Sequence, residues 1–235
     1  MSEHIIIERD GAVAELRLAR PEKRNAITTA MYAALADGIG AAHADAGVRA
    51  VLISGEGSSF TAGNDLHDFI ANPPQGRESP VFRFLHGLAD ATKPIVAAVQ
   101  GQAVGIGTTM LLHCDIVVLA DDARLRMPFV DLALVPEAAS SLLVPRAIGH
   151  ARAAEMLMLG DAIDAATALA WGLANRVVPA GSERAEALAL AKRLLRDDAA
   201  GVAARMDAEG AHFAAQLASP ELKGAIAAFF ARKAA

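Results

Sequence analysis

At 235 residues the chain is long enough for one large domain or two modest ones, and its 54% hydrophobic residues can form a large core. A net charge of −5 argues against nucleic acid as the main partner. The single cysteine, Cys114, excludes an internal disulfide and a cysteine metal cluster, and we expect it to be a small buried hydrophobe.

The N-terminal residues do not show the pattern of a targeting signal. No basic stretch is followed by a long apolar run, so no secretory signal is expected. No apolar run reaches the roughly 18 residues of a membrane span without a charge or a helix breaker. These features predict a soluble, cytoplasmic protein.

The chain begins with a predicted hairpin and helix. Two β-rich runs within residues 4–18 flank Asp10-Gly11, a strong hairpin turn signal. A helix follows, and Thr28 or Thr29 is expected to be its N-cap. One face of that helix is apolar at helical spacing: Met31, Leu35 and Ile39.

Three continuous apolar runs then predict buried strands within residues 49–55, 93–101 and 114–121. Residues 102–113, between the last two, form a glycine turn that leads into a helix. Uninterrupted apolar strands are typical of a sheet covered on both faces. Strands that alternate with helices indicate an α/β or α+β fold.

The remaining segments are a loop and a helical C-terminal part. Residues 71–80 are too polar and proline-rich for an element, and we expect either a surface connection or a mobile lid. From Arg152 the chain is nearly all helical apart from an edge strand within residues 174–179. A helix over 183–206 has an apolar seam: Leu188, Leu195 and Val202. We therefore expect a core at residues 1–182 and a helical oligomerisation region at 183–235.

Several common site patterns are absent from the sequence. The glycines after the strand at 49–55 lack the third glycine of a dinucleotide fingerprint, since Phe60 stands there. No G-x-S-x-G elbow is present. The seven histidines are scattered without zinc-ligand spacing, and His67 and His113 are expected on helix surfaces.

Two glycine turns and one acidic residue remain as candidates for a catalytic site. FTAGNDL (60–66) and GQAVGIG (101–107) each follow an apolar strand and could expose backbone N–H groups at a helix start. Two converging N–H donors would form an oxyanion hole. The stretch LVPEAASS (134–141) places Glu137 among apolar and small residues. Glu137 is either a surface turn residue or a general base in an apolar pocket.

Three segments follow one another in the chain: FTAGNDL, KPIVAAVQGQAVGIGTTMLLHCDIVVLADDARL and AAEMLMLGDAIDAATALAWGLANRVVP. In content and order they resemble the enoyl-CoA hydratase/isomerase (crotonase) superfamily, and the resemblance runs from about Ile5 to Lys233. It implies a spiral of ββα units with a C-terminal helical region used for trimerisation, often in a dimer of trimers. It also implies an acyl-CoA thioester substrate and no cofactor other than the coenzyme A of the substrate.

The resemblance also implies roles for individual residues. The thioester carbonyl would lie between the backbone N–H groups of Asn64 and Ile106, where typical members carry a small residue and a glycine. Further substrate contacts are expected at Lys23, Arg24, Ala62, Gly63, Asp65, Leu66, Gly105 and Pro136. Of these, the basic pair Lys23 and Arg24 is the candidate for the CoA phosphates.

The acid positions favour one reaction of the superfamily. The two glutamates of its hydratases correspond to Thr109 and Phe129, neither of which is a base. Glu137 stands in PEAASS, which resembles the PEG-SS segment of peroxisomal-type Δ3,Δ2-enoyl-CoA isomerases. Moving a double bond from C3 to C2 needs one carboxylate that removes a C2 proton and returns one at C4, and burial should raise the pKa of that carboxylate.

Other functions remain open at this point. The protein could be an enoyl-CoA hydratase with residual activity, or an acyl-CoA hydrolase or dehalogenase that uses Glu137 as a nucleophile. It could also be a non-catalytic acyl-CoA-binding subunit. The resemblance implies assembly as a trimer or a dimer of trimers, and the apolar seam together with Phe229 and Phe230 is the candidate contact surface. The alternative is that these side chains pack only on their own subunit.

Overall fold

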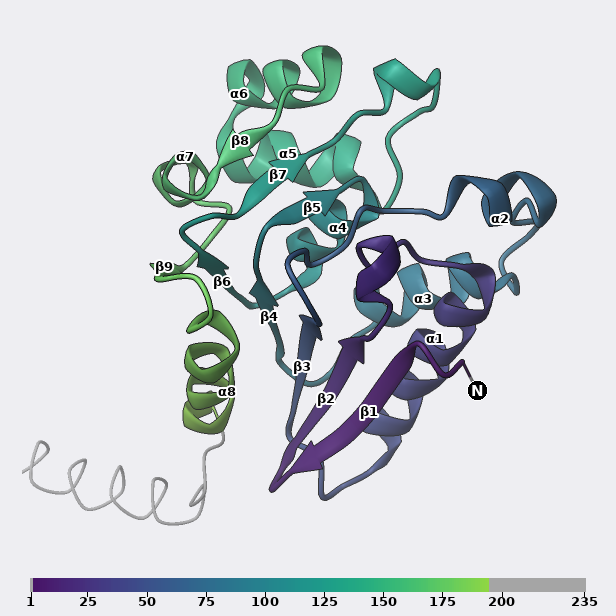
Figure 1. Cartoon of the computed structure of the whole chain (residues 1–235), viewed down its shortest axis with the longest axis vertical. Helices are drawn as coiled ribbons and strands as arrows, with labels where there is room; N and C mark the ends of the chain where they lie inside the picture. Colours follow the sequence, from purple (N-terminus) through teal and green to yellow (C-terminus); the bar gives the residue numbers. More distant parts are fainter. Residues whose placement is uncertain (1, 195–235) are drawn as a thin grey trace, which may run out of the picture. The chain divides into compact units, whose positions relative to one another are not determined.

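The computed structural model describes residues 2–194, and its centre is a six-stranded sheet (Figure 1). The strand order is β1-β2-β3-β4-β6-β9, in which β1 and β2 are antiparallel and the other neighbours are parallel. The strands are β1 (Ile5–Asp10), β2 (Val13–Leu18), β3 (Ala50–Gly55), β4 (Ile95–Val99), β6 (Ile116–Ala120) and β9 (Arg176–Val178). The predicted strands are therefore confirmed, including the hairpin and the edge position of β9.

Local sequence signals account for the first elements. Asp10 pairs with Val13 across a two-residue turn, in which Gly11 has a φ of +62°. Helix α1 (Thr29–Ala44) follows, and the side chain of Thr28 accepts a hydrogen bond from the N–H of Met31 as its N-cap. The expected apolar face of α1 is buried.

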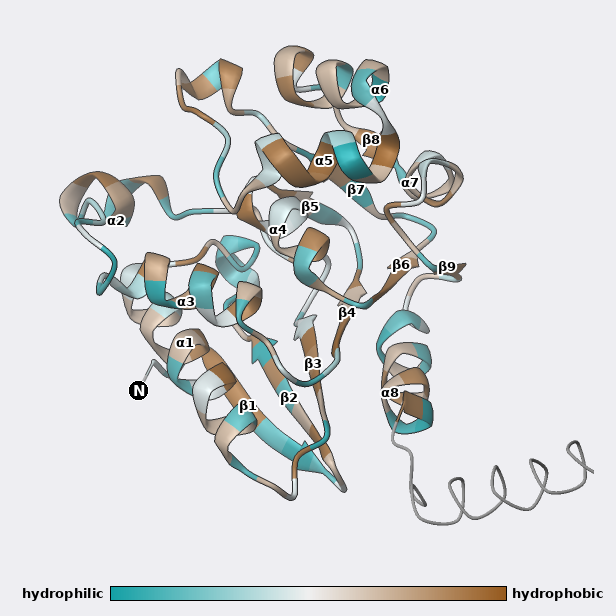
Figure 2. Ribbon diagram, turned by 180° about the vertical axis from the view of Figure 1, so that it is seen from behind, coloured by the Kyte–Doolittle hydropathy of each residue, from teal (hydrophilic) through white to brown (hydrophobic). Residues whose placement is uncertain are grey.

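Both faces of the sheet are covered, as the continuous apolar strands predicted. On one face, residues such as Val51 and Ile53 belong to the core that includes α1 and α3 (Pro80–Ala89). On the other face, their neighbours Ala50 and Leu52 pack with α8 (Glu183–Leu194). Figure 2 shows the resulting hydrophobic colour along β3 and β4. Alternate side chains of one strand thus serve two separate cores.

A second, smaller sheet was not expected from the sequence. It has the order β5-β7-β8, formed by β5 (Gln102–Val104), β7 (Arg124–Arg126) and β8 (Ile163–Asp164). These strands have two or three residues, which is too short for a period-2 pattern to show. After β5, the predicted glycine turn leads into the short helix α4 (Ile106–Thr109) and the 3₁₀ turn η2 (Met110–His113).

Short helices make up most of the rest. The polar segment predicted as a loop connects α2 (Leu66–Ala71) to α3, which begins at Pro80. The other helical elements are η1 (Pro21–Lys23), η3 (Val130–Leu132), α5 (Ser140–Ile148), α6 (His150–Ala154), η4 (Glu155–Leu159) and α7 (Ala165–Trp171). No helix among residues 2–194 is long and apolar enough to cross a membrane.

Part of the predicted oligomerisation surface lies outside the described residues. This holds for Leu195, Val202, Phe229 and Phe230, and Leu188 is partly buried against the sheet of its own subunit. The domain boundary at 182/183 and the trimeric assembly therefore stay predictions.

Candidate active site

The two glycine turns singled out in the sequence lie against each other. The N–H of Thr61 donates to the carbonyl of Gln102 at 2.9 Å, and the N–H of Val104 donates to the carbonyl of Thr61 at 3.0 Å. Gly63, with a φ of +89°, approaches so closely that a Cβ atom would lie 2.8 Å from the carbonyl oxygen of Val104. A Cβ on Gly107 would lie 2.5 Å from Cγ2 of Thr61. The glycines thus allow the backbones of the two turns to touch.

In each turn, the residue predicted for the oxyanion hole has a backbone N–H without an acceptor among the described residues. The N–H groups of Gly63 and Asp65 donate to protein oxygens at 3.0 and 2.9 Å, whereas no hydrogen bond among the described residues uses the N–H of Asn64 that lies between them. Ile106 is the first residue of α4, so its N–H has no acceptor inside the helix. Both residues line one cavity. This is the arrangement that an oxyanion hole requires.

That cavity has a volume of about 320 Å³ and is largely apolar. Among its lining residues in the described part of the chain, Glu137 has the one ionisable side chain. The lining consists of Ala62, Gly63, Asn64, Leu66, Phe69, Val104, Gly105, Ile106, Pro128, Phe129, Leu132, Leu134, Val135 and Glu137. An isolated carboxylate among apolar side chains, next to backbone donors, makes this cavity the candidate active site.

The segment around Glu137 is held in place at several atoms. The N–H and the hydroxyl of Ser140 both donate to the carbonyl oxygen of Glu137, at 2.9 and 2.6 Å. Thr109 Oγ1 donates to Oε1 of the Glu137 carboxylate at 2.5 Å. Ala138 and Ala139 have φ values of +53° and +54°, in the left-handed region that L-residues rarely adopt. The backbone is therefore strained at the two residues that follow Glu137.

Burial raises the pKa of Glu137 above its usual value, and the hydrogen bond from Thr109 opposes this rise. The direction agrees with the expectation from the apolar sequence around it. A carboxylate with a raised pKa is a stronger base, and its acid form is also easier to reach near neutral pH. Both properties suit a group that takes up a proton and then gives it back.

Two further polar contacts support the site and were missed from the sequence. The phenol of Tyr32, on α1, donates to Oδ1 of Asn64 at 2.5 Å. Burial, and secondarily the charge of Glu137, raise the pKa of Tyr32 well above its usual value, so the phenol is neutral. Nε2 of His113 lies 2.9 Å from the carbonyl oxygen of Ala138, which corrects the expectation of a plain helix-surface residue. No local pattern signals either contact.

The positions that carry the acids of hydratases both border this site without a carboxylate. Phe129 lines the cavity and is 5% exposed. Thr109 is fully buried and bonded to Glu137. Glu137 therefore has no second carboxylate facing it among the lining residues that the structure describes.

The residues predicted to contact substrate fall into two groups. Four line the cavity: Ala62, Gly63, Leu66 and Gly105. The side chain of Asp65 instead caps α2 and accepts from Arg20 at 2.8 Å, and this bond is the main cause that lowers the pKa of Asp65. Pro136 stands beside Glu137 but is not part of the lining.

The proposed CoA phosphate ligands lie on an adjoining loop. Lys23 and Arg24 are both exposed. The carbonyl of Arg24 accepts a hydrogen bond from the N–H of Ala62 at 2.8 Å, which joins this loop to the cavity lining. The basic pair is therefore accessible and near the cavity, as a phosphate contact requires.

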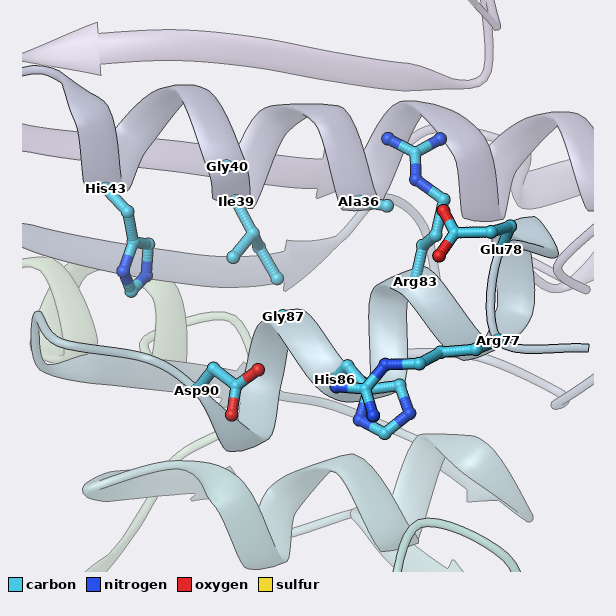
Figure 3. A pocket seen from close by; sticks show the side chains of 10 residues that line it. All are labelled: Ala36, Ile39, Gly40, His43, Arg77, Glu78, Arg83, His86, Gly87 and Asp90. Atoms are coloured by element: carbon cyan, nitrogen blue, oxygen red, sulfur yellow. The ribbon is translucent and has the colours of Figure 1, made fainter.

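A second cavity, of about 370 Å³, lies between α1 and α3 (Figure 3). Figure 3 shows Arg83 reaching from α3 toward α1, where it donates to Asp37 at 2.6 Å. Acidic and basic side chains are mixed in the lining: His43, Arg77, Glu78, Arg83, His86 and Asp90. The mixed charges give this second cavity no net electrostatic preference for an anion or a cation, and Glu137 does not line it. The apolar cavity is therefore kept as the candidate active site.

Comparisons with known proteins agree with the fold. The family model described as enoyl-CoA hydratase/isomerase matches residues 8–226. A solved enoyl-CoA hydratase/isomerase of Pseudoalteromonas atlantica T6c is 41% identical, with a TM-score of 0.80 and 98% of each chain covered.

Two curated relatives carry out different reactions. Human enoyl-CoA delta isomerase 2 is 35% identical over 184 residues, which cover 75% of this chain and 46% of that protein. The 4-chlorobenzoyl coenzyme A dehalogenase-2 of an Arthrobacter species is 34% identical over 182 residues, which cover 74% of this chain and 66% of the dehalogenase. These relatives therefore share the family and differ in the reaction that their names give.

Proposed function

The chain belongs to the enoyl-CoA hydratase/isomerase family, and we propose that this acyl-CoA enzyme is a Δ3,Δ2-enoyl-CoA isomerase. The observation that supports this proposal most is an apolar cavity in which Glu137 is the one carboxylate among the described residues, and which is also lined by Asn64 and Ile106, whose N–H groups have no acceptor there. The similarity to an enoyl-CoA delta isomerase adds support, although this chain spans less than half the length of that relative.

In this mechanism the N–H groups of Asn64 and Ile106 bind the thioester oxygen of the substrate. Removal of a C2 proton places negative charge on that oxygen, as a thioester enolate. Hydrogen-bond donors already aimed at the developing charge stabilise the transition state more than the ground state. Because the cavity is apolar, little water competes for the same oxygen.

Glu137 supplies both proton transfers. It first accepts the C2 proton as the electrons of that C–H bond move into the conjugated enolate. It then returns a proton to C4 as the enolate electrons flow back, which leaves the double bond between C2 and C3. The carboxylate ends in its original charge state, so one base is sufficient for a complete turnover.

Hydration of a 2-enoyl thioester is less well supported by the same residues. Addition of water is helped by two acids that hold and activate it, and the corresponding positions carry Thr109 and Phe129. Phe129 also places a ring in the cavity lining where a water-binding carboxylate would be needed. The proposed isomerase chemistry requires neither group to be acidic.

The test is to assay a 3-enoyl-CoA and a 2-enoyl-CoA side by side with the wild-type protein and the Glu137→Gln variant. We expect the wild-type protein to isomerise the 3-enoyl substrate. In Glu137→Gln, kcat should fall by at least about 10²-fold, the lower end of general acid–base effects. KM should stay nearly unchanged, because the lost interaction acts in the transition state.

Glu78→Gln, in the separate cavity of Figure 3, is the matched control and should keep wild-type rates. Wild-type turnover in Glu137→Gln would reject the mechanism. Hydration of the 2-enoyl substrate without isomerisation of the 3-enoyl substrate would replace the proposed reaction.

A further inference from the structure

The short helix α4 contributes at both of its ends to the site. Its first residue, Ile106, offers a backbone N–H to the cavity, and its last residue, Thr109, donates its hydroxyl to Glu137 Oε1 at 2.5 Å. Thr109 is completely buried, so water does not reach its side chain. One turn of backbone therefore links the oxyanion donor to the base.

The bond from Thr109 differs from what a threonine in a helix usually does. A helical threonine hydroxyl tends to bond to a backbone carbonyl nearby in the sequence. The neighbouring Thr108 behaves in this way and donates to the carbonyl of Ala103 at 2.5 Å. Thr109 instead donates to a side chain 28 residues further along the chain. Its hydroxyl is thus directed at the carboxylate.

This contact distinguishes the two oxygens of the carboxylate. Oε1 accepts a hydrogen bond, and an oxygen that carries a proton is the poorer acceptor, so a proton taken up by Glu137 is favoured on Oε2. The bond also restrains rotation of the carboxylate about its last torsion. A fixed Oε1 and a mobile proton on Oε2 suit transfer between two carbons on one face of the acyl chain.

We propose that Thr109 is a positioning residue for Glu137: it holds Oε1 so that Oε2 alone removes the C2 proton and returns a proton to C4. This inference rests on the proposed isomerase function. In the first step the C2–H bond breaks and an Oε2–H bond forms, with the electron pair left in the enolate. In the second step a pair of enolate electrons forms the C4–H bond with the proton of Oε2, the Oε2–H bond breaks, and its electron pair returns to Oε2, which leaves the double bond between C2 and C3.

The surroundings of Glu137 identify which pH effects belong to this contact. From α1, the neutral phenol of Tyr32 is near enough for the charge of Glu137 to affect it. From η2, His113 bonds to the carbonyl of Ala138, the residue that follows Glu137. Thr109 lowers the pKa of Glu137 against the larger effect of burial. Removing the hydroxyl should therefore move the titration of Glu137 to higher pH.

The experiment compares Thr109→Val, which keeps the shape and removes the hydroxyl, with Thr109→Ser, which keeps the hydroxyl. For Thr109→Val we expect kcat to fall on the order of tenfold, as for a lost hydrogen bond to a charged group. KM should change little, and the acid limb of the kcat/KM profile should move to higher pH. Thr109→Ser should restore both the rate and the acid limb toward wild type.

Thr108→Val is the matched control, because it removes a buried hydroxyl from the same helix that does not touch Glu137. It should leave the acid limb in place. A shift as large as that of Thr109→Val would mean that the effect reports general damage to α4, and would overturn the proposal. A wild-type rate and pH profile in Thr109→Val would also overturn it.

A readout independent of turnover separates this inference from the proposed function. The carboxyl band of Glu137 can be found by infrared difference spectroscopy as the band that Glu137→Gln lacks, and then titrated in each variant. We expect this titration to move to higher pH in Thr109→Val even if the substrate assignment is wrong. An unmoved band in an active isomerase would reject the positioning role alone.

Discussion

Ala139 offers a test of how the backbone aims Glu137. It is exposed and has φ +54° and ψ +19°, at the N-cap of α5. The left-handed conformation costs an L-residue roughly 1–2 kcal/mol, and glycine avoids this cost while losing about 0.5–1 kcal/mol more conformational entropy on folding. Because the side chain of Ala139 is exposed, little packing changes in Ala139→Gly. We expect a net stabilisation of about 0.5–1 kcal/mol.

Thermal unfolding followed by circular dichroism measures this change. For a chain of this size 1 kcal/mol corresponds to roughly 2–4 °C, so Tm should rise by about 1–4 °C. Ala139→Val should lower Tm, since a β-branched residue resists positive φ at a cost of roughly 1–3 kcal/mol. Isomerase activity should be retained in the glycine variant, which adopts the same backbone, and reduced in the valine variant, which does not adopt it readily.

Ala133 provides the matched control for this prediction. It is also exposed and left-handed, with φ +51°, but it lies at the end of η3, four residues before Glu137. Ala133→Gly should raise Tm by a similar amount. A lower Tm in Ala139→Gly together with a higher Tm in Ala133→Gly would show that Ala139 is not strained, and would refute the reasoning.

Two further predictions concern charge. Replacing Lys23 and Arg24 by alanine should raise KM for acyl-CoA at low salt. The effect should be smaller at high salt, because added ions screen exposed charges. An unchanged KM at low salt would show that this pair does not bind the CoA phosphates. Since the pKa of Glu137 is raised in the folded state, its ionisation opposes folding as pH rises above 4.5 through the folded pKa. The Tm of Glu137→Gln minus the Tm of wild type should therefore be larger at neutral pH than at pH 4. A Tm difference that does not change with pH would contradict this.

Local patterns were enough to predict the elements that build the main sheet. The turn at Asp10 and Gly11, the N-cap at Thr28 and the continuous apolar strands each depend on neighbours within a few residues. The glycines of the two turns were also visible, because only glycine allows the approach seen at Gly63. The strands of the smaller sheet were not predicted, since two or three residues carry no period.

The contacts that refine the site depend on long separations in the chain. Tyr32 and Asn64 are 32 residues apart, and Thr109 and Glu137 are 28 apart. No spacing rule relates such pairs, and each member alone is ordinary for its element. The sequence predicts that apolar surroundings raise the pKa of Glu137. The Thr109 hydroxyl, which lowers this pKa, is found only in the folded structure.

The segment from Ala133 to Ser140 brings together features that oppose folding. Three alanines there have positive φ, and the carboxylate of Glu137 is held where burial raises its pKa. These costs are offset by bonds from outside and from the end of the segment, namely those of Thr109, His113 and Ser140. Such strain persists only where the surroundings over-determine the backbone, and it gathers at functional sites. A residue in a solvated surface turn does not require a partly buried carboxylate or a strained backbone. These features therefore favour a general base over a surface turn residue for Glu137.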